Sequence, residues 1–219
     1  MPLNREEGLM LLKETRIVAI IRGVEEQHIT GVAEALLDGG IPVMEVTLNT
    51  PGALDMIGRL QQEYGDRMFI GAGTVLDVED ARKALDGGAS YLVTPNMDEE
   101  VIRYAVERKA PIFPGAMTPT EVVNAWKAGA TAIKIFPGAS LGIGYIKELM
   151  GPLGHIPMMA VGGVTESNIG EFMSIGRYGV GVGGSLINLK EIHAGNYDWV
   201  RSKAARLSAA DQSLTCGYP

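Results

Sequence analysis

Lys134 is the one charged residue in an otherwise apolar segment, residues 130–136, whose only other polar side chain is a threonine. Such a segment is typical of a strand in a parallel sheet covered on both faces, so the sequence predicts a buried amine. Desolvation lowers the pKa of a buried lysine, and the neutral amine can attack a ketone to form an imine. The alternative is a lysine whose stem is buried while its charge reaches a phosphate or an ion-pair partner.

Glu45 is the matching negative charge, because it stands alone in the apolar segment 42–47. Strand alternation places Val43, Glu45 and Thr47 on one face, and two isolated opposite charges in buried strands are expected to meet. A buried ion pair is the alternative, but replacing such a pair with apolar residues is often neutral or stabilising. The pattern therefore favours a general acid/base beside an imine-forming lysine.

Two glycine-rich phrases follow the last two apolar runs of the chain. They are Ala160-Val161-Gly162-Gly163-Val164 and Gly181-Val182-Gly183-Gly184-Ser185. Glycine lets a backbone approach an anion closely, and backbone N–H groups at such loops commonly bind phosphate. Together the two phrases predict a phosphate site.

Arg22 and Thr74 follow two other apolar runs and are candidates for binding a carboxylate through charge-assisted hydrogen bonds. The alternatives are a surface arginine and a threonine that caps a helix. The three histidines, His28, His155 and His193, fall in different predicted elements, so no histidine base or histidine-based metal set is expected.

These residues need elements that bring them together, and eight short apolar runs, each followed by a polar amphipathic stretch, supply them. The predicted strands are residues 16–21, 42–47, 68–71, 90–94, 111–114, 130–135, 156–160 and 178–182. Their spacing of roughly 20 to 30 residues suits a strand plus a crossover helix. A doubly wound sheet would usually need only five or six strands, so the rhythm predicts a (β/α)8 TIM barrel. The candidate side chains then share the C-terminal ends of the strands.

The remaining segments predict an extra N-terminal helix over residues 4–13 and a final helix over 196–210, both packing outside the barrel. The phrases Asp38-Gly39-Gly40, Asp86-Gly87-Gly88 and Lys127-Ala128-Gly129 each precede a strand and indicate a recurring helix-to-strand turn. No linker divides the chain, so we expect one domain spanning residues 1–219.

Composition excludes several classes of partner. The chain has 219 residues and a formal net charge of -7, so we do not expect the basic surface that binding to nucleic acid or to an anionic membrane requires. Cys216 is the only cysteine, so no intrachain disulfide can form, and a reducing cytoplasm is expected. No run approaches the ~20 apolar residues needed to span a bilayer.

The sequence resembles the class I aldolases for 2-keto-3-deoxy-6-phosphogluconate and 4-hydroxy-2-oxoglutarate, with their phosphogalactonate relatives. The resemblance runs from about Ile17 to Ser185. It rests on motifs that occur in family order: Ile20-Ile21-Arg22, Glu45-Val46-Thr47-Leu48, Ile70-Gly71-Ala72-Gly73-Thr74-Val75, Thr94-Pro95-Asn96, Phe113-Pro114-Gly115, Lys134-Ile135-Phe136-Pro137, Gly162-Gly163-Val164 and Gly183-Gly184-Ser185.

The resemblance implies a Schiff base on Lys134, acid–base catalysis by Glu45, and cleavage of the phosphorylated sugar acid to pyruvate and glyceraldehyde 3-phosphate. It further implies a homotrimer that needs no metal or other cofactor. Alternatives are cleavage of 4-hydroxy-2-oxoglutarate, a phosphate-binding epimerase or isomerase, and a barrel that binds a sugar phosphate without turnover. The substrate-binding residues that the resemblance implies are Arg22, Thr74, Pro95, Phe136, Val161, Gly162, Gly163, Gly184 and Ser185.

Two departures from the phosphogluconate pattern bear on the substrate. Asn49 stands where those aldolases typically carry arginine, and Val161 stands where they carry the threonine of Pro-Thr-Gly-Gly. Both changes resemble the phosphogalactonate branch. The lost threonine hydroxyl would read the configuration at the cleaved carbon, so the preferred C4 epimer stays open.

Overall fold

The computed structural model describes residues 1–175 and 178–215, so Cys216 lies outside the described part of the chain. The strands are β1 (Ile17–Ile21), β2 (Val43–Thr47), β3 (Phe69–Gly73), β4 (Leu92–Val93), β5 (Ile112–Phe113), β6 (Gly115–Ala116), β7 (Ile133–Ile135), β8 (Met158–Val161) and β9 (Gly179–Val182). The helices are α1 (Arg5–Thr15), η1 (Glu26–His28), α2 (Ile29–Asp38), α3 (Ala53–Tyr64), α4 (Val78–Asp86), α5 (Glu99–Glu107), α6 (Pro119–Lys127), α7 (Gly138–Leu153), α8 (Ile169–Ile175), α9 (Leu189–His193) and α10 (Tyr197–Thr215). Within the described ranges, none of the helices combines the length and apolar character that a membrane crossing requires.

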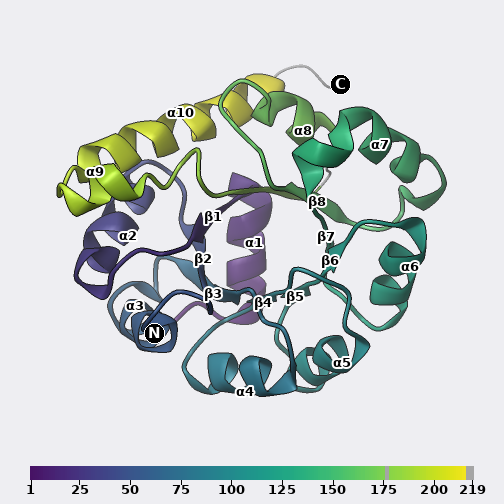
Figure 1. Cartoon of the computed structure of the whole chain (residues 1–219), viewed down its shortest axis with the longest axis horizontal. Helices are drawn as coiled ribbons and strands as arrows, with labels where there is room; N and C mark the ends of the chain where they lie inside the picture. The colour runs from purple at the N-terminus through teal and green to yellow at the C-terminus, as the bar shows by residue number, and fades with distance from the viewer. Residues whose placement is uncertain (176–177, 216–219) are drawn as a thin grey trace.

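The strands form a nearly closed parallel barrel with the helices around it, as Figure 1 shows. The strand order is β5-β4-β3-β2-β1-β9-β8-β7-β6, and β1 pairs with both β2 and β9. The predicted barrel is confirmed, with one correction to the fifth strand. That strand is divided at Pro114 into β5 and β6, because proline has no N–H to donate to a ladder. It also extends beyond its predicted end at Pro114 to Ala116.

The barrel has two separate cores, one between sheet and helices and one inside the ring. Met44 and Val46 of β2 belong to the outer core, whereas Val43 belongs to the inner one. This alternation turns Glu45 toward the lumen. The inner core consists of Leu12, Val18, Val43, Phe69, Tyr91, Val93, Phe113, Ala132, Met159 and Val161.

Helix α1 closes one end of the lumen. A reciprocal cap begins it: the Asn4 side chain accepts from the backbone N–H of Glu7, whose carboxylate accepts from the Asn4 N–H at 2.8 Å. Its Leu12 is part of the inner core, and Figure 1 shows the helix within the outline of the ring. The predicted N-terminal helix is therefore present, but its expected position on the outer wall is wrong, because Leu12 is buried among lumen residues.

The predicted recurring turn is present after α2, α4 and α6. Gly40, Gly88 and Gly129 have φ angles of 82°, 103° and 105°. Glycine adopts these values without strain, which lets the chain reverse from helix to strand in two or three residues. Helix α10 contacts α2 and α8 on the outside of the barrel, as predicted for the final helix.

The contact between α1 and the barrel generates a stability prediction. A Cβ atom on Gly8 would overlap the ring of Phe69 in β3. We expect Gly8→Ala to lower the free energy of unfolding by about 1 to 3 kcal/mol, although alanine is the better helix former. Gly144→Ala in α7 is the control, because a Cβ there meets nothing within 4 Å. Urea unfolding of both variants makes the comparison, and equal stabilities would contradict the tight contact.

Candidate active site

Lys134 lies at the centre of β7 and is 6% exposed. Its side chain stays inside the lumen, and Nζ lies 5.0 Å from the centroid of the Phe136 ring. Burial lowers the pKa of the Lys134 amine, the charge of Arg22 adds to this effect, and the charge of Glu45 opposes it. The amine is thus buried rather than extended to solvent, which favours a nucleophile over a surface charge.

Glu45 is buried on the opposite wall, in the middle of β2, with an exposed fraction of 2%. Burial raises the pKa of its carboxyl, and the positive charges of Lys134 and Arg22 oppose the increase. Its Oε1 lies so close to β3 that a Cβ on Gly73 would overlap it. Glycine at position 73 therefore gives the carboxyl its space.

The two groups face one cavity without forming an ion pair. Within the described residues, no nitrogen–oxygen distance of 4.0 Å or less joins Lys134 to Glu45. The amine and the carboxyl are therefore separated across the lumen. The cavity between them is small, with about 10 Å³ open to the centre of a water-sized sphere, and it is lined by Val18, Ile20, Glu45, Val93, Phe113, Lys134, Met159, Val161 and Gly181.

Arg22 lies at the mouth of the barrel, in an exposed position directly after β1. The backbone on both sides of it is held by threonines that the sequence reasoning did not assign. Thr47 Oγ1 donates to the carbonyl of Ile21 at 3.2 Å, and the Gly23 N–H donates to Thr50 Oγ1 at 2.9 Å. Two threonines in the segment Glu45-Val46-Thr47-Leu48-Asn49-Thr50, at the end of a predicted buried strand, could have indicated hydroxyls that bond to a neighbouring loop.

Thr74 directly follows β3 and has a φ angle of 58°, which is rare for a β-branched residue. It does not cap α4, because Asp77 accepts the N–H of Asp80 at that helix start at 2.8 Å. The capping alternative is thereby excluded. Pro95 follows β4, where its carbonyl packs against the backbone of Gly115 in β6.

The two glycine loops lie side by side after β8 and β9. Ser185 Oγ donates to the carbonyl of Val164 at 2.6 Å and joins them. Gly162 and Gly163 have φ angles of 96° and 71°. Within residues 1–175 and 178–215, the N–H groups of Gly163, Gly184 and Ser185 have no hydrogen-bond partner, so they can bind an anion.

Asn168 braces the first of these loops and was missed by the sequence reasoning. Its Oδ1 accepts the N–H of Thr165 at 2.7 Å, and its Nδ2 donates to the Gly163 carbonyl at 3.0 Å. The asparagine three residues after Thr165 was the available signal, because such side chains commonly bond to nearby loop backbone.

Phe136 connects the lysine to the first glycine loop. Its ring lies near Lys134 Nζ and in van der Waals contact with the position of a Cβ on Gly162. By contrast, His28 and His193 lie outside this site, between η1 and α9, with ring centroids 5.8 Å apart. No group of three or more metal-binding side chains occurs among the residues that the structure describes.

Comparison with known proteins adds an independent finding. The sequence matches the KDPG and KHG aldolase family over residues 10–203. The 2-dehydro-3-deoxy-6-phosphogalactonate aldolase of Escherichia coli strain K12 is 39% identical over 171 residues, which cover 78% of this chain and 83% of that protein.

Solved structures agree with this match. One described as native KDPGal superimposes with a TM-score of 0.86 at 35% identity and covers 91% of this chain and 96% of that chain. A KDPG aldolase from Legionella pneumophila, with pyruvate captured as a covalent carbinolamine intermediate, superimposes with a TM-score of 0.85 at 25% identity. That alignment covers 91% of this chain and 97% of the other.

The raised pKa of Glu45 predicts how its removal affects stability. As pH rises above 4.5, the carboxyl ionises more readily in the unfolded chain than in the lumen, so the folded state loses relative stability. Glu45→Gln stays neutral and avoids this loss. We expect its Tm to exceed that of the unmodified protein by about 2 to 4 °C at pH 8, and by less at pH 5.

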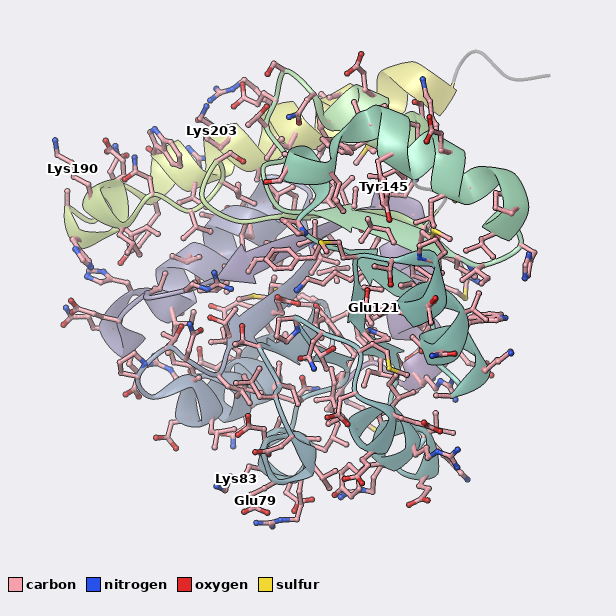
Figure 2. The ribbon with its side chains drawn as sticks, turned by 45° about the vertical axis from the view of Figure 1, so that its right-hand side comes forward. Glu79, Lys83, Glu121, Tyr145, Lys190 and Lys203 are labelled. Carbon is pink, nitrogen blue, oxygen red and sulfur yellow. The ribbon has the colours of Figure 1, made fainter. Side chains whose placement is uncertain are left out.

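Thermal unfolding at the two pH values tests this, with Glu79→Gln as the matched control. Glu79 lies at the outer rim of the molecule beside Lys83, as Figure 2 shows. The pKa of Glu79 is held at about 2 by its hydrogen bond with Arg82, so its replacement should not raise Tm. A Glu45→Gln protein less stable than the unmodified one at pH 8 would contradict a net cost of burying this carboxylate.

Proposed function

The chain belongs to the KDPG and KHG aldolase family, and from this premise we propose that it cleaves a phosphorylated 2-keto-3-deoxy sugar acid through a Schiff base on Lys134. As a member of this family it is an aldehyde-lyase. The proposed products are pyruvate and glyceraldehyde 3-phosphate. The observation that carries the proposal is the buried amine of Lys134, facing the Glu45 carboxyl across one cavity without an ion pair.

In the proposed mechanism, neutral Lys134 Nζ attacks the C2 ketone of the substrate, and the carbinolamine loses water to form an iminium. Glu45 gives and takes the protons of these steps. The Legionella relative carries pyruvate as a carbinolamine, the adduct that an amine forms with a ketone before water is lost.

The iminium accepts the electron pair of the C3–C4 bond. Glu45, directly or through a water, removes the proton of the C4 hydroxyl, the C3–C4 bond breaks, and the aldehyde leaves. The resulting enamine is protonated at C3, and water then hydrolyses the imine to release pyruvate and free Lys134. No electron donor or acceptor other than the substrate is needed.

The mouth of the barrel supplies groups for both anionic ends of the substrate. We assign the phosphate to the free N–H groups of Gly163, Gly184 and Ser185, because the glycine loops hold them together at one edge. The carboxylate is assigned to Thr74 and Arg22, with Pro95 and Phe136 lining the same mouth. The charge of Arg22 already acts on both Glu45 and Lys134, which places it within electrostatic range of the reaction.

The galactonate epimer is the proposed preferred substrate. The Escherichia coli relative is named for the phosphogalactonate, and Val161 puts an apolar side chain at the cavity where the phosphogluconate pattern has threonine. A valine cannot bond to the C4 hydroxyl, so the epimer that depends on such a bond is disfavoured. By the same resemblance, we propose one domain, a homotrimer and a cytoplasmic location.

Trapping with borohydride tests the covalent step. Incubation with pyruvate and borohydride should add one reduced adduct to Lys134, located by peptide mass spectrometry. Lys134→Met should form no adduct and lose nearly all cleavage, whereas Lys127→Met, at an exposed site in α6, should keep both. An active preparation without an adduct on Lys134 would exclude this mechanism.

Rates with the two phosphorylated C4 epimers test the substrate assignment. We expect kcat/KM to favour the galactonate epimer by about tenfold to a hundredfold, the range that one hydroxyl contact provides in an apolar pocket. Val161→Thr should reduce or reverse this preference, because it restores a hydroxyl at the cavity. Equal kcat/KM values in the unmodified enzyme would show that Val161 does not select the epimer.

A further inference from the structure

Tyr91, which directly precedes β4, carries a buried hydroxyl with no role in the site described above. The residue is 0% exposed, and its hydroxyl is the one buried side-chain polar atom without a hydrogen-bond partner among the described residues. Each such atom in a folded protein needs an explanation, because an unsatisfied buried hydroxyl is destabilising.

Two glycines of β3 bring this hydroxyl close to Glu45. Glu45 pairs in register with Gly71, and Ala72 pairs with Leu92, which places Tyr91 level with Gly71 on the next strand. The ring of Tyr91 lies over Gly71: its Cζ, the carbon that bears the hydroxyl, is 2.5 Å from the position of a Cβ there. A side chain at position 71 would separate Tyr91 from Glu45, and glycine does not.

The carboxyl of Glu45 lies over the second glycine, Gly73. Both polar groups therefore lie on the lumen face of β3, at positions two residues apart. Such positions are about 7 Å apart along a strand. No direct hydrogen bond joins the two groups, but one water with two bonds of ~2.8 Å spans most of this distance.

We propose that Tyr91 is a positioning residue for Glu45: its hydroxyl donates through one buried water to the Glu45 carboxylate and holds it over Gly73. This inference deepens the proposed function, because it concerns the acid–base residue of that site. It accounts for the polar group at the bottom of an otherwise apolar lumen, where Tyr91 packs against Phe69 and Phe113 at ring-centroid distances of 4.6 and 5.6 Å.

Three groups act on Glu45 from the surrounding elements. Lys134 faces it from β7 and Arg22 from the loop after β1, and the remaining residues that line the cavity are apolar. The third is Tyr91 at the start of β4, close enough that the charge of Glu45 adds to the effect of burial in raising the pKa of the Tyr91 hydroxyl. A hydrogen bond to the carboxylate form lowers a carboxyl pKa. Tyr91 thus opposes the increase that burial imposes on Glu45, and its removal should raise the pKa of Glu45 further.

The alternative is a tyrosine that only fills space, and the two possibilities predict different effects of Tyr91→Phe on Tm and on the titration of Glu45. If the hydroxyl is unbonded, its removal relieves an unsatisfied polar group and should raise Tm by about 2 to 4 °C. If it holds Glu45 through water, its removal should leave Tm unchanged or lower and should shift the titration of Glu45.

The decisive experiment follows the infrared carbonyl band of the protonated Glu45 carboxyl across pH in the full-length, substrate-free protein. The band is assigned by its loss in Glu45→Gln. In Tyr91→Phe we expect the titration midpoint to rise by about half to one pH unit. An unchanged midpoint in Tyr91→Phe would overturn the proposal.

Tyr178→Phe is the matched control. Tyr178 is a second tyrosine packed against the inner core, half-buried, with its ring 5.9 Å from Phe113, and burial raises the pKa of its hydroxyl to about 12. Removing this hydroxyl should not move the Glu45 midpoint, and an equal rise in both variants would also overturn the proposal. Because the titration needs no turnover, its result is separate from that of borohydride trapping: Tyr91→Phe should still form the Lys134 adduct.

Discussion

The chemistry proposed for this barrel depends on two groups of opposite charge that are buried in one lumen without touching. Direct contact between Lys134 and Glu45 would give a buried ion pair in which the amine stays charged. Separation has the opposite effect, because desolvation then lowers the pKa of the amine and raises that of the carboxyl. Both groups are moved toward the neutral pH range, where a nucleophile and a proton carrier are most useful.

The separation is maintained by residues that have no chemistry of their own. Gly71 and Gly73 remove two side chains from the lumen face of β3, and the freed space holds the Tyr91 ring and the Glu45 carboxyl. At the mouth, three hydroxyls fix backbone: Thr47 and Thr50 hold the ends of the Arg22 turn, and Ser185 joins the two glycine loops. The reacting groups are thus positioned by strand register and close backbone packing.

Periodicity was sufficient to predict the barrel and the lumen-facing position of Glu45, because strand alternation depends only on local pattern. It could not place α1, since Leu12 looks the same on an outer wall as at the end of a lumen. The split at Pro114 was predictable from the missing proline N–H, but the continuation of the strand as β6 required the pairing with β7. The role proposed for Tyr91 could not be predicted from the sequence. Its approach to Glu45 depends on how β2, β3 and β4 align across Gly71, and local sequence patterns do not determine that register.

The floor that α1 provides makes the lumen a blind-ended well. A bound keto acid would extend from Lys134 toward the glycine loops at the rim, so its two fragments cannot depart by separate routes. In the proposed binding mode the phosphorylated aldehyde lies nearer the opening and leaves before the pyruvate part, which stays bonded to Lys134 below it. This geometry implies that the two products leave in a fixed order. In the condensation direction, the three-carbon enamine on Lys134 would form first and the aldehyde would bind above it.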